Sequence, residues 1–196
     1  MHKKDRWGVV ANLRKIVLTF LALLLSYGVP PAALASTPPS KPAAEVQLLA
    51  DTAYYPALLG KIHSAAKSID LVMYLWKISD GGGKPAELVR ALGEARRRGV
   101  AVRVILESSG HDEKLNRANR ETAELLRQEG VTAFFDSPDV TTHAKLAVID
   151  QRFCLVGSHN LTMSALERNH EISLLLDNPS LAGELSRYVE ALLKNR

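Results

Sequence analysis

The stretch "HAKLAVIDQRFCLVGS", residues 143–158, holds two apolar runs that meet at a short polar turn. Two such runs joined by Gln151 and Arg152 are typical of a β-hairpin. His143 and Lys145 stand two apart in the first run and would share one face of a strand, while apolar residues fill the other positions. Polar side chains in a buried strand cost free energy unless they are paired or used. The pattern therefore predicts a strand covered on both faces that carries chemistry at its beginning.

Upstream of the hairpin, strand-like and helix-like segments alternate. Strands are expected at 45–50, 69–76, 100–108 and 131–137, and helices at 54–68, 85–99 and 112–129. Downstream, a strand at 170–177 precedes a last helix from about 179 to 195. The alternation predicts an α/β fold with a mixed, mostly parallel β-sheet flanked by helices on both faces.

The first 35 residues have the pattern of an export signal. Five basic residues precede an apolar core at 16–29, and small residues at 33–35 suit a cleavage site. Fourteen apolar-leaning residues fall short of the ~20 that span a bilayer, although retention of the leader as a membrane anchor is the alternative. We expect a cleavable signal peptide over 1–35, a Pro-rich tether over 36–44, one domain over 45–196, and a periplasmic or secreted location.

The charge of the chain depends on this leader. The whole sequence has a net charge of +4, but residues 1–35 hold five of its 25 basic and one of its 21 acidic residues. Residues 36–196 therefore have 20 of each and no net charge. A basic surplus would indicate a nucleic acid or an anionic membrane as partner. Residues 36–196 have no basic surplus, so only local basic patches would attract either partner.

Further polar residues are expected near the hairpin histidine. Ser158 and Asn160 end the second hairpin strand, two apart, and can converge on the same end as His143. Imidazole, ammonium, hydroxyl and carboxamide groups together would bind a tetrahedral oxyanion such as phosphate. Glu171 opens the next strand and is an available carboxylate to hold an imidazole in one tautomer. Asp150 lies on the opposite face or in the turn by parity, where it would fix the turn through backbone N–H groups.

These residues resemble the HKD signature of the phospholipase D superfamily, His-x-Lys-x4-Asp-x6-Gly-Ser. The matching positions are His143, Lys145, Asp150, Gly157 and Ser158, and Asn160 and Glu171 match further family positions. The resemblance implies a phospholipase D-like fold and phosphodiester chemistry through a covalent phosphohistidine. It gives catalytic roles to His143, Lys145, Ser158, Asn160 and Glu171, and structural roles to Asp150 and Gly157. It implies no cofactor and no metal.

The family pattern requires two copies of the motif, whereas this sequence contains one. The resemblance therefore implies a homodimer in which a two-fold axis brings two His143 residues to a shared active site. The short, exported, single-motif format is similar to that of the small bacterial endonucleases of the family. A nucleic acid is accordingly the leading substrate.

Two alternatives to an endonuclease on DNA or RNA stay open. One is a phospholipase D that cleaves phospholipid head groups, and the other is an inactive nucleic-acid or lipid binding module. The absence of an amphipathic lipid-binding segment after residue 35 favours the endonuclease. The zero net charge argues against it, because nucleases use attraction to the phosphate backbone.

Substrate contacts are expected from residues outside the motif. Trp76 ends the strand expected at 69–76, where it would belong to the core, and it is also a candidate for stacking on a base or meeting an acyl chain. His111, Lys114 and Arg117 follow another strand, where they would meet a nucleic acid backbone or form a solvated helix face. His159 is expected at the surface or as a secondary contact.

Overall fold

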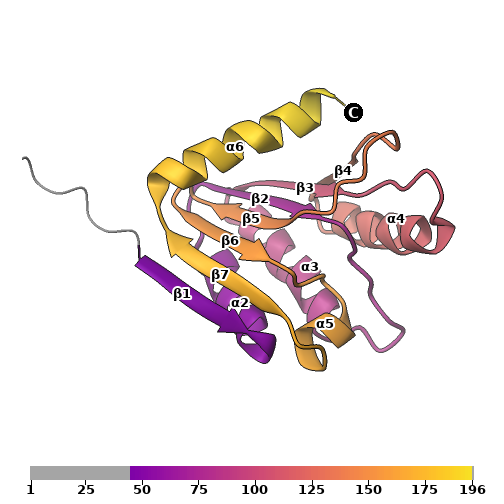
Figure 1. Cartoon of the computed structure of the whole chain (residues 1–196), viewed down its shortest axis with the longest axis horizontal. Coiled ribbons are helices and arrows are strands. Elements are labelled where there is room, and N and C mark those ends of the chain that lie inside the picture. The colour runs from indigo at the N-terminus through magenta and orange to yellow at the C-terminus, as the bar shows by residue number, and fades with distance from the viewer. Residues whose placement is uncertain (1–44, 196) are drawn as a thin grey trace, which may run out of the picture. The chain divides into compact units, whose positions relative to one another are not determined.

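Seven strands form a single sheet in the order β1-β7-β6-β5-β2-β3-β4 (Figure 1). The computed structural model describes residues 45–195. The predicted signal peptide over 1–35 and the tether over 36–44 lie outside these residues. The strands are β1 (Glu45–Ala50), β2 (Ser68–Met73), β3 (Ala101–Leu106), β4 (Thr132–Phe135), β5 (Lys145–Ile149), β6 (Phe153–Gly157) and β7 (Ile172–Asp177).

The helices follow the predicted segments closely. They are α2 (Tyr54–Ser64), α3 (Gly83–Arg97), α4 (Glu113–Gln128), α5 (Met163–Glu167) and α6 (Pro179–Lys194), with a 3-10 turn η1 (Asp51–Ala53) before α2. Gly99 and Gly130, which come just after the ends of α3 and α4, have φ angles of 91° and 76°, a region that glycine enters without strain. The sequence did not predict α5, because five residues are too few to show a helical period.

The strand pairing corrects one part of the predicted fold. The mixed sheet is confirmed, but only β2–β3 and β3–β4 are parallel. The four other pairs are antiparallel, so the sheet is mostly antiparallel rather than mostly parallel. The reason is that β5, β6 and β7 run up and down in succession beside β2, and β1 then pairs with β7 at the far edge instead of joining the parallel strands.

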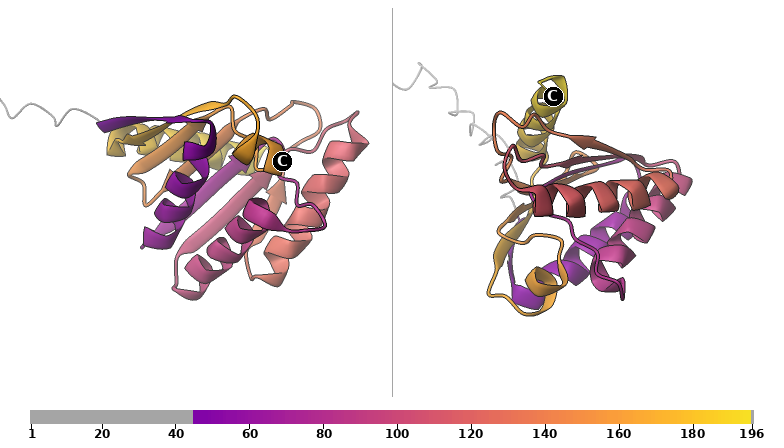
Figure 2. Two further views of the ribbon diagram at one scale, coloured as in Figure 1. Left: turned by 90° about the horizontal axis from the view of Figure 1, so that it is seen from below. Right: turned by 90° about the vertical axis from the view of Figure 1, so that its right-hand side faces the viewer.

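Helices cover both faces of the sheet, as predicted. Helices α2, α3 and α4 lie against one face, and α6 lies alone against the other (Figure 2). Strand β5 contributes to both layers: Ala147 and Ile149 belong to the core under α2 and α3, and Leu146 and Val148 to the core under α6. The prediction of a strand covered on both faces is confirmed. Within residues 45–195, no helix combines the length and apolarity needed to cross a membrane.

Candidate active site

The residues of the predicted site lie at one edge of the sheet, where four strand ends are adjacent. Strand β5 runs antiparallel to both β2 and β6, and β6 runs antiparallel to β7. The start of β5 therefore lies beside the ends of β2 and β6, and the start of β7 lies next to the end of β6 (Figure 1). This arrangement gathers segments that are about 100 residues apart in the sequence.

His143 lies in the loop before β5, not within the strand as expected. The strand begins at Lys145, and the His143 side chain is exposed. Its imidazole packs against the ring of Tyr74, with 4.4 Å between centroids and 62° between planes. Among the residues that the structure describes, none forms a hydrogen bond with the imidazole. A ring that is exposed and free of hydrogen bonds suits attack on an external substrate.

Lys145 is buried beside His143, with 6% of its surface exposed. Its Nζ donates a 2.7 Å hydrogen bond to the backbone carbonyl of His143 and lies 4.7 Å from the centroid of the Tyr74 ring. Burial lowers the pKa of Lys145, and the charge of Glu171 partly offsets this shift. A partly desolvated ammonium interacts strongly with any anion that reaches it.

Ser158 and Glu171 meet at the same edge. The Ser158 hydroxyl donates to the Glu171 carboxylate and accepts a 3.1 Å hydrogen bond from the N–H of Ile172. Asn169 Nδ2 donates to the other Glu171 oxygen at 3.0 Å. The expected contact between Glu171 and the His143 imidazole is not formed within residues 45–195. Glu171 instead interacts with Ser158 and with the charge of Lys145.

Asn160 lies beside the segment that follows β2. The N–H of the next residue, Leu161, donates to the carbonyl of Leu75 at 3.0 Å, and Trp76 and Leu161 form an isolated parallel bridge. In the described part of the chain, Asn160 Oδ1 is buried without a hydrogen-bond partner. Buried polar atoms are nearly always paired, so this acceptor is available to a group that enters the site.

Asp150 lies in the turn that follows β5, one of the two places that the parity argument allowed. Its carboxylate accepts hydrogen bonds from the N–H groups of Ala66, Lys67 and Ser68 at 2.9, 2.7 and 3.0 Å. These amides belong to the segment that enters β2, rather than to the hairpin turn itself. Burial acts to raise the pKa of Asp150, but the three amides outweigh it and the pKa is lowered. Asp150 therefore joins β5 to β2 and has a structural role.

We expect Asp150→Ala to lower the free energy of unfolding by about 3 kcal/mol, because three amides lose a charged acceptor. The melting temperature should fall by about 10 °C, measured by circular dichroism, while Asp80→Ala in an exposed turn should change little. Because the pKa of Asp150 is lower in the folded than in the unfolded protein, its contribution to the free energy of unfolding is complete above the unfolded pKa of about 3.9. The contribution is lost as the pH falls through the folded pKa, so the difference in stability between Asp150→Ala and wild type should shrink in acid. A folded, inactive Asp150→Ala protein with an unchanged melting temperature would contradict this role.

Gly157 allows β6 and β7 to approach closely. A Cβ atom at this position would lie 2.2 Å from Ser173 Oγ and 2.4 Å from the carbonyl oxygen of Ile172. Only glycine fits there without movement of the neighbouring strand. The geometry agrees with the structural role that the motif gives to Gly157.

Of the predicted substrate contacts, the one assigned to Trp76 is wrong. Its side chain is fully buried, and its Nε1 donates to the carbonyl of Pro85 at 3.2 Å, so it belongs to the core. His111, Lys114 and Arg117 are exposed in the loop after β3 and at the beginning of α4. No hydrogen bond or ion pair in the described residues joins them to the site, and their contact with substrate stays a prediction.

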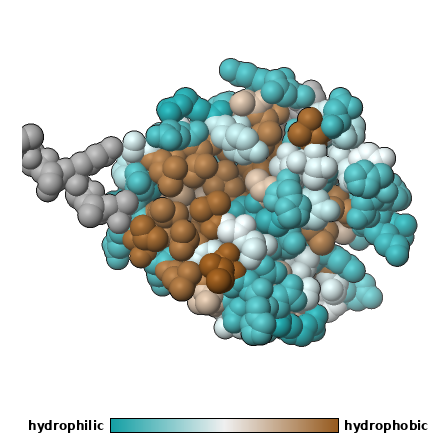
Figure 3. Space-filling view, viewed as in Figure 1, coloured by the Kyte–Doolittle hydropathy of each residue, from teal (hydrophilic) through white to brown (hydrophobic). Residues whose placement is uncertain are grey.

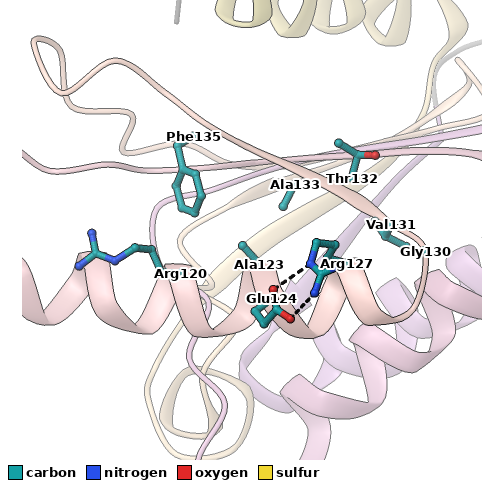
Figure 4. A pocket seen from close by; sticks show the side chains of 9 residues that line it. All are labelled: Arg120, Ala123, Glu124, Arg127, Gly130, Val131, Thr132, Ala133 and Phe135. Atoms are coloured by element: carbon teal, nitrogen blue, oxygen red, sulfur yellow. Dashed lines mark hydrogen bonds and ion pairs between the residues drawn. The ribbon is translucent and has the colours of Figure 1, made fainter.

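A shallow pocket between α4 and β4 contains none of the predicted catalytic residues (Figure 4). Two arginines line it, but each is neutralised: Arg127 pairs with Glu124 at 2.6 Å, and Arg120 pairs with Glu113. This part of α4 therefore has the balanced charges of a solvated helix face, and it does not form a free anion site.

His159 is a buried residue of the framework, which corrects the expectation of a surface position. Its ring stacks on Tyr54 with 4.3 Å between centroids and 7° between planes. Its Nδ1 lies 2.7 Å from Ser173 Oγ and its Nε2 lies 2.9 Å from the carbonyl oxygen of Asp51. The carbonyl only accepts, so Nε2 carries a proton. Asp51 in turn accepts from the N–H of Glu171 at 2.9 Å, which links His159 to the position of Glu171.

Two carboxylates that the sequence reading missed hold the loop before His143. The N–H of Thr142 donates to Glu107 at 2.6 Å, and the Thr142 hydroxyl donates to Asp136. Glu107 and Asp136 are buried and directly follow β3 and β4. An acidic residue immediately after an apolar strand was the available signal, because a carboxylate buried at a strand end requires a partner.

A comparison with models of protein families shows which family the chain belongs to. The model described as "Cardiolipin synthase, PLD-like domain" matches residues 58–193. The chain belongs to the phospholipase D superfamily. The resemblance carried by the HKD residues is thereby confirmed, and with it membership of a superfamily of phosphodiester-acting enzymes.

Curated relatives of this phospholipase D-like chain include lipid synthases. Cardiolipin synthase A of Pectobacterium atrosepticum is 34% identical over 113 residues, which is 54% of this chain and 23% of that protein. Cardiolipin synthase A of Proteus mirabilis is 30% identical over 130 residues, which is 66% of this chain and 25% of that protein. The match thus spans about a quarter of these relatives.

Solved structures of similar fold include much shorter proteins. Nuc of Salmonella typhimurium, a phospholipase D family member, superimposes with a TM-score of 0.66 and 23% identity over 78% of this chain and 95% of that one. NucT of Helicobacter pylori has a TM-score of 0.62 and 19% identity over 78% and 97%. These superpositions confirm the phospholipase D-like fold of the described domain.

Proposed function

We propose that the protein is a metal-independent phosphodiesterase that works through a phosphohistidine on His143 and acts on DNA or RNA as an exported endonuclease. The observation that carries the proposal is that the exposed imidazole of His143 and the buried ammonium of Lys145 both contact the ring of Tyr74, while Lys145 Nζ donates to the His143 carbonyl. Together they offer a nucleophile and a fixed positive charge at one point of the surface.

The reaction follows in two steps. In the first, a ring nitrogen of His143 attacks phosphorus, the bond from phosphorus to the leaving oxygen breaks, and a second imidazole gives that oxygen a proton. In the second, that imidazole takes a proton from water, the water oxygen bonds to phosphorus, and the bond to His143 breaks. Lys145 Nζ and Asn160 Nδ2 would donate to the non-bridging oxygens of the phosphoryl group, and the Ser158 hydroxyl would do so once it turns from Glu171.

A second copy of the chain would supply the second imidazole, namely His143 of the partner subunit. An exposed apolar face continues from the site across β6, β7 and β1, and we call it the apolar sheet face (Figure 3). It consists of Val156, Ile172, Val46 and Leu48, with exposures of 39%, 62%, 54% and 62%. Large exposed apolar patches mark interaction sites. Because Ile172 follows Glu171 directly, a partner seated on this face would lie next to the site.

Nucleic acid is favoured over lipid by the extent of the matches. The chain covers nearly the whole length of Nuc and NucT, but only about a quarter of the cardiolipin synthases. Superposition over nearly the whole length of these short proteins supports the endonuclease among the two candidates. The identity with the cardiolipin synthases is nevertheless higher, so hydrolysis of a phospholipid head group is the second candidate.

The experiment that tests the proposal offers plasmid DNA, RNA and a fluorescent phospholipid to residues 36–196 in excess EDTA. We expect cleavage of nucleic acid that survives the chelator and declines with added salt, because phosphate contacts are screened. Release of a head group without nucleic acid cleavage would establish the phospholipase instead. Cleavage that requires a divalent metal would overturn the metal-independent mechanism, and absence of turnover on all three substrates would indicate a binding module.

A further inference from the structure

Tyr74 contacts both members of the catalytic pair with one ring. The centroid of the ring lies 4.4 Å from that of the His143 imidazole, and Lys145 Nζ lies 4.7 Å from the same centroid. The tyrosine directly follows β2, whereas the other two residues belong to β5 and the loop before it. A side chain from a neighbouring strand thus fixes the relative position of the two groups.

The backbone of Tyr74 is held from two sides. Its N–H donates to the carbonyl of Ala144, the residue between His143 and Lys145, at 3.1 Å. Its carbonyl accepts a 2.9 Å hydrogen bond from Asn119 Nδ2. Asn119 is fully buried in α4, and its Oδ1 accepts a 2.9 Å hydrogen bond from the N–H of Trp76. The backbone from which the ring extends therefore cannot move relative to the loop without breaking these hydrogen bonds.

We propose that Tyr74 is a positioning residue of the active site, whose aromatic ring orients the His143 imidazole and supports the Lys145 ammonium. A cation near the face of an aromatic ring is stabilised by the ring quadrupole, more strongly where water is excluded. The imidazole forms no hydrogen bond within residues 45–195, so the contact with Tyr74 limits the rotamers that it adopts. This inference rests on the proposed function, because it assigns the residue a role in that chemistry.

The ring, and not the phenol hydroxyl, carries the proposed role. Tyr74→Phe keeps the aromatic face and should retain turnover within about three-fold. Tyr74→Leu removes it and should lower kcat about 100-fold, since a displacement of about 1 Å at a reacting group has effects of that size. KM should change less than kcat, because binding depends on Lys145 among several groups and not on the orientation of the nucleophile. Tyr74→Met is a second non-aromatic variant if the leucine protein folds poorly.

The experiment measures kcat and KM on bis(4-nitrophenyl) phosphate, together with the NMR resonances of the His143 ring in each variant. The matched control is Tyr188→Leu, the same substitution at a partly exposed tyrosine of α6. We expect the His143 resonances to shift in Tyr74→Leu, because the ring current is lost, and to stay near their wild-type positions in Tyr74→Phe and Tyr188→Leu.

Equal losses in Tyr74→Phe and Tyr74→Leu would overturn the inference, because the hydroxyl would then matter. Full activity of a folded Tyr74→Leu protein would overturn it as well. A wild-type protein without turnover on any phosphodiester would refute the proposed function alone. The positioning of His143 by Tyr74 would then be decided by the His143 resonances.

Discussion

Replacing His143 by asparagine should abolish phosphodiester turnover, with a loss of about four orders of magnitude or more. Asparagine has no nucleophilic nitrogen, so the covalent intermediate cannot form, and losses of this size accompany removal of a nucleophile. The fold should be retained, because the side chain is exposed and its ring forms no hydrogen bond in the described domain. The melting temperature should stay within about 2 °C of wild type.

The control is His63→Asn, the same change at a half-exposed histidine of α2 that lies 3.9 Å from Glu94. Turnover of this variant should equal that of wild type. A purified His143→Asn protein that keeps even one hundredth of the activity would exclude His143 as the nucleophile.

Mixing the two proteins extends the result to the proposed homodimer. If one active site uses both His143 residues of a dimer, a dimer with one wild-type and one variant subunit is inactive. The two proteins are unfolded and refolded together in equal amounts. The mixture should then have about one quarter of the activity of the same total amount of wild-type protein, as expected for random pairing in a two-fold assembly. About one half would remain if each subunit worked alone, and that outcome would refute the shared site.

The helices, the strands and the motif were predictable because their signals are local. Strand β5 alternates between two apolar faces, and glycines end α3 and α4 where the helical period stops. The family signature places His143, Lys145 and Ser158 by spacing alone. Their meeting at one edge follows once the hairpin and its neighbour β2 are known.

The rest depended on contacts between distant segments. The pairings of β5 with β2 and of β1 with β7 add antiparallel pairs to the predicted hairpin, and no local pattern specifies them. An aromatic residue at the end of a buried strand looks the same whether it fills the core or lines a site. The strand-end segment after β2 contains both cases, since Trp76 is buried whereas Tyr74 contacts His143. His159 was misplaced for a similar reason, because its partners Asp51 and Ser173 come from other strand ends.

The second large effect is expected at Lys145. Lys145→Met should lower kcat/KM about 1000-fold, the upper range for removing one group that stabilises the transition state. Methionine has a similar length, so the loss reports the missing charge rather than a cavity. The control is Lys194→Met at the exposed end of α6, which should keep full activity.

The pH profile gives an independent test of Lys145. Burial favours the neutral amine and lowers the pKa, so the ammonium loses its proton below the usual value of about 10.4. The rate should therefore fall on the alkaline side as the pH rises through this lowered value. In Lys145→Arg the alkaline decrease in rate should move to higher pH, because the guanidinium group stays charged. The rate at neutral pH should drop, because the planar guanidinium does not replace a compact ammonium. An alkaline limb that is unchanged in the arginine variant would assign it to another group.

The melting temperature should distinguish the functional role of Lys145 from the structural role of Asp150. A buried ammonium is costly where its charge is only partly compensated, and within residues 45–195 Lys145 Nζ donates one hydrogen bond, to the His143 carbonyl. Lys145→Met should therefore raise the melting temperature or leave it unchanged while activity is lost, as is common when a functional group is removed from a site that needs it. Asp150→Ala should show the reverse order of effects. A large fall in the melting temperature of Lys145→Met, with activity lost only in proportion to unfolded protein, would show that the lysine stabilises the fold and does not act on phosphate.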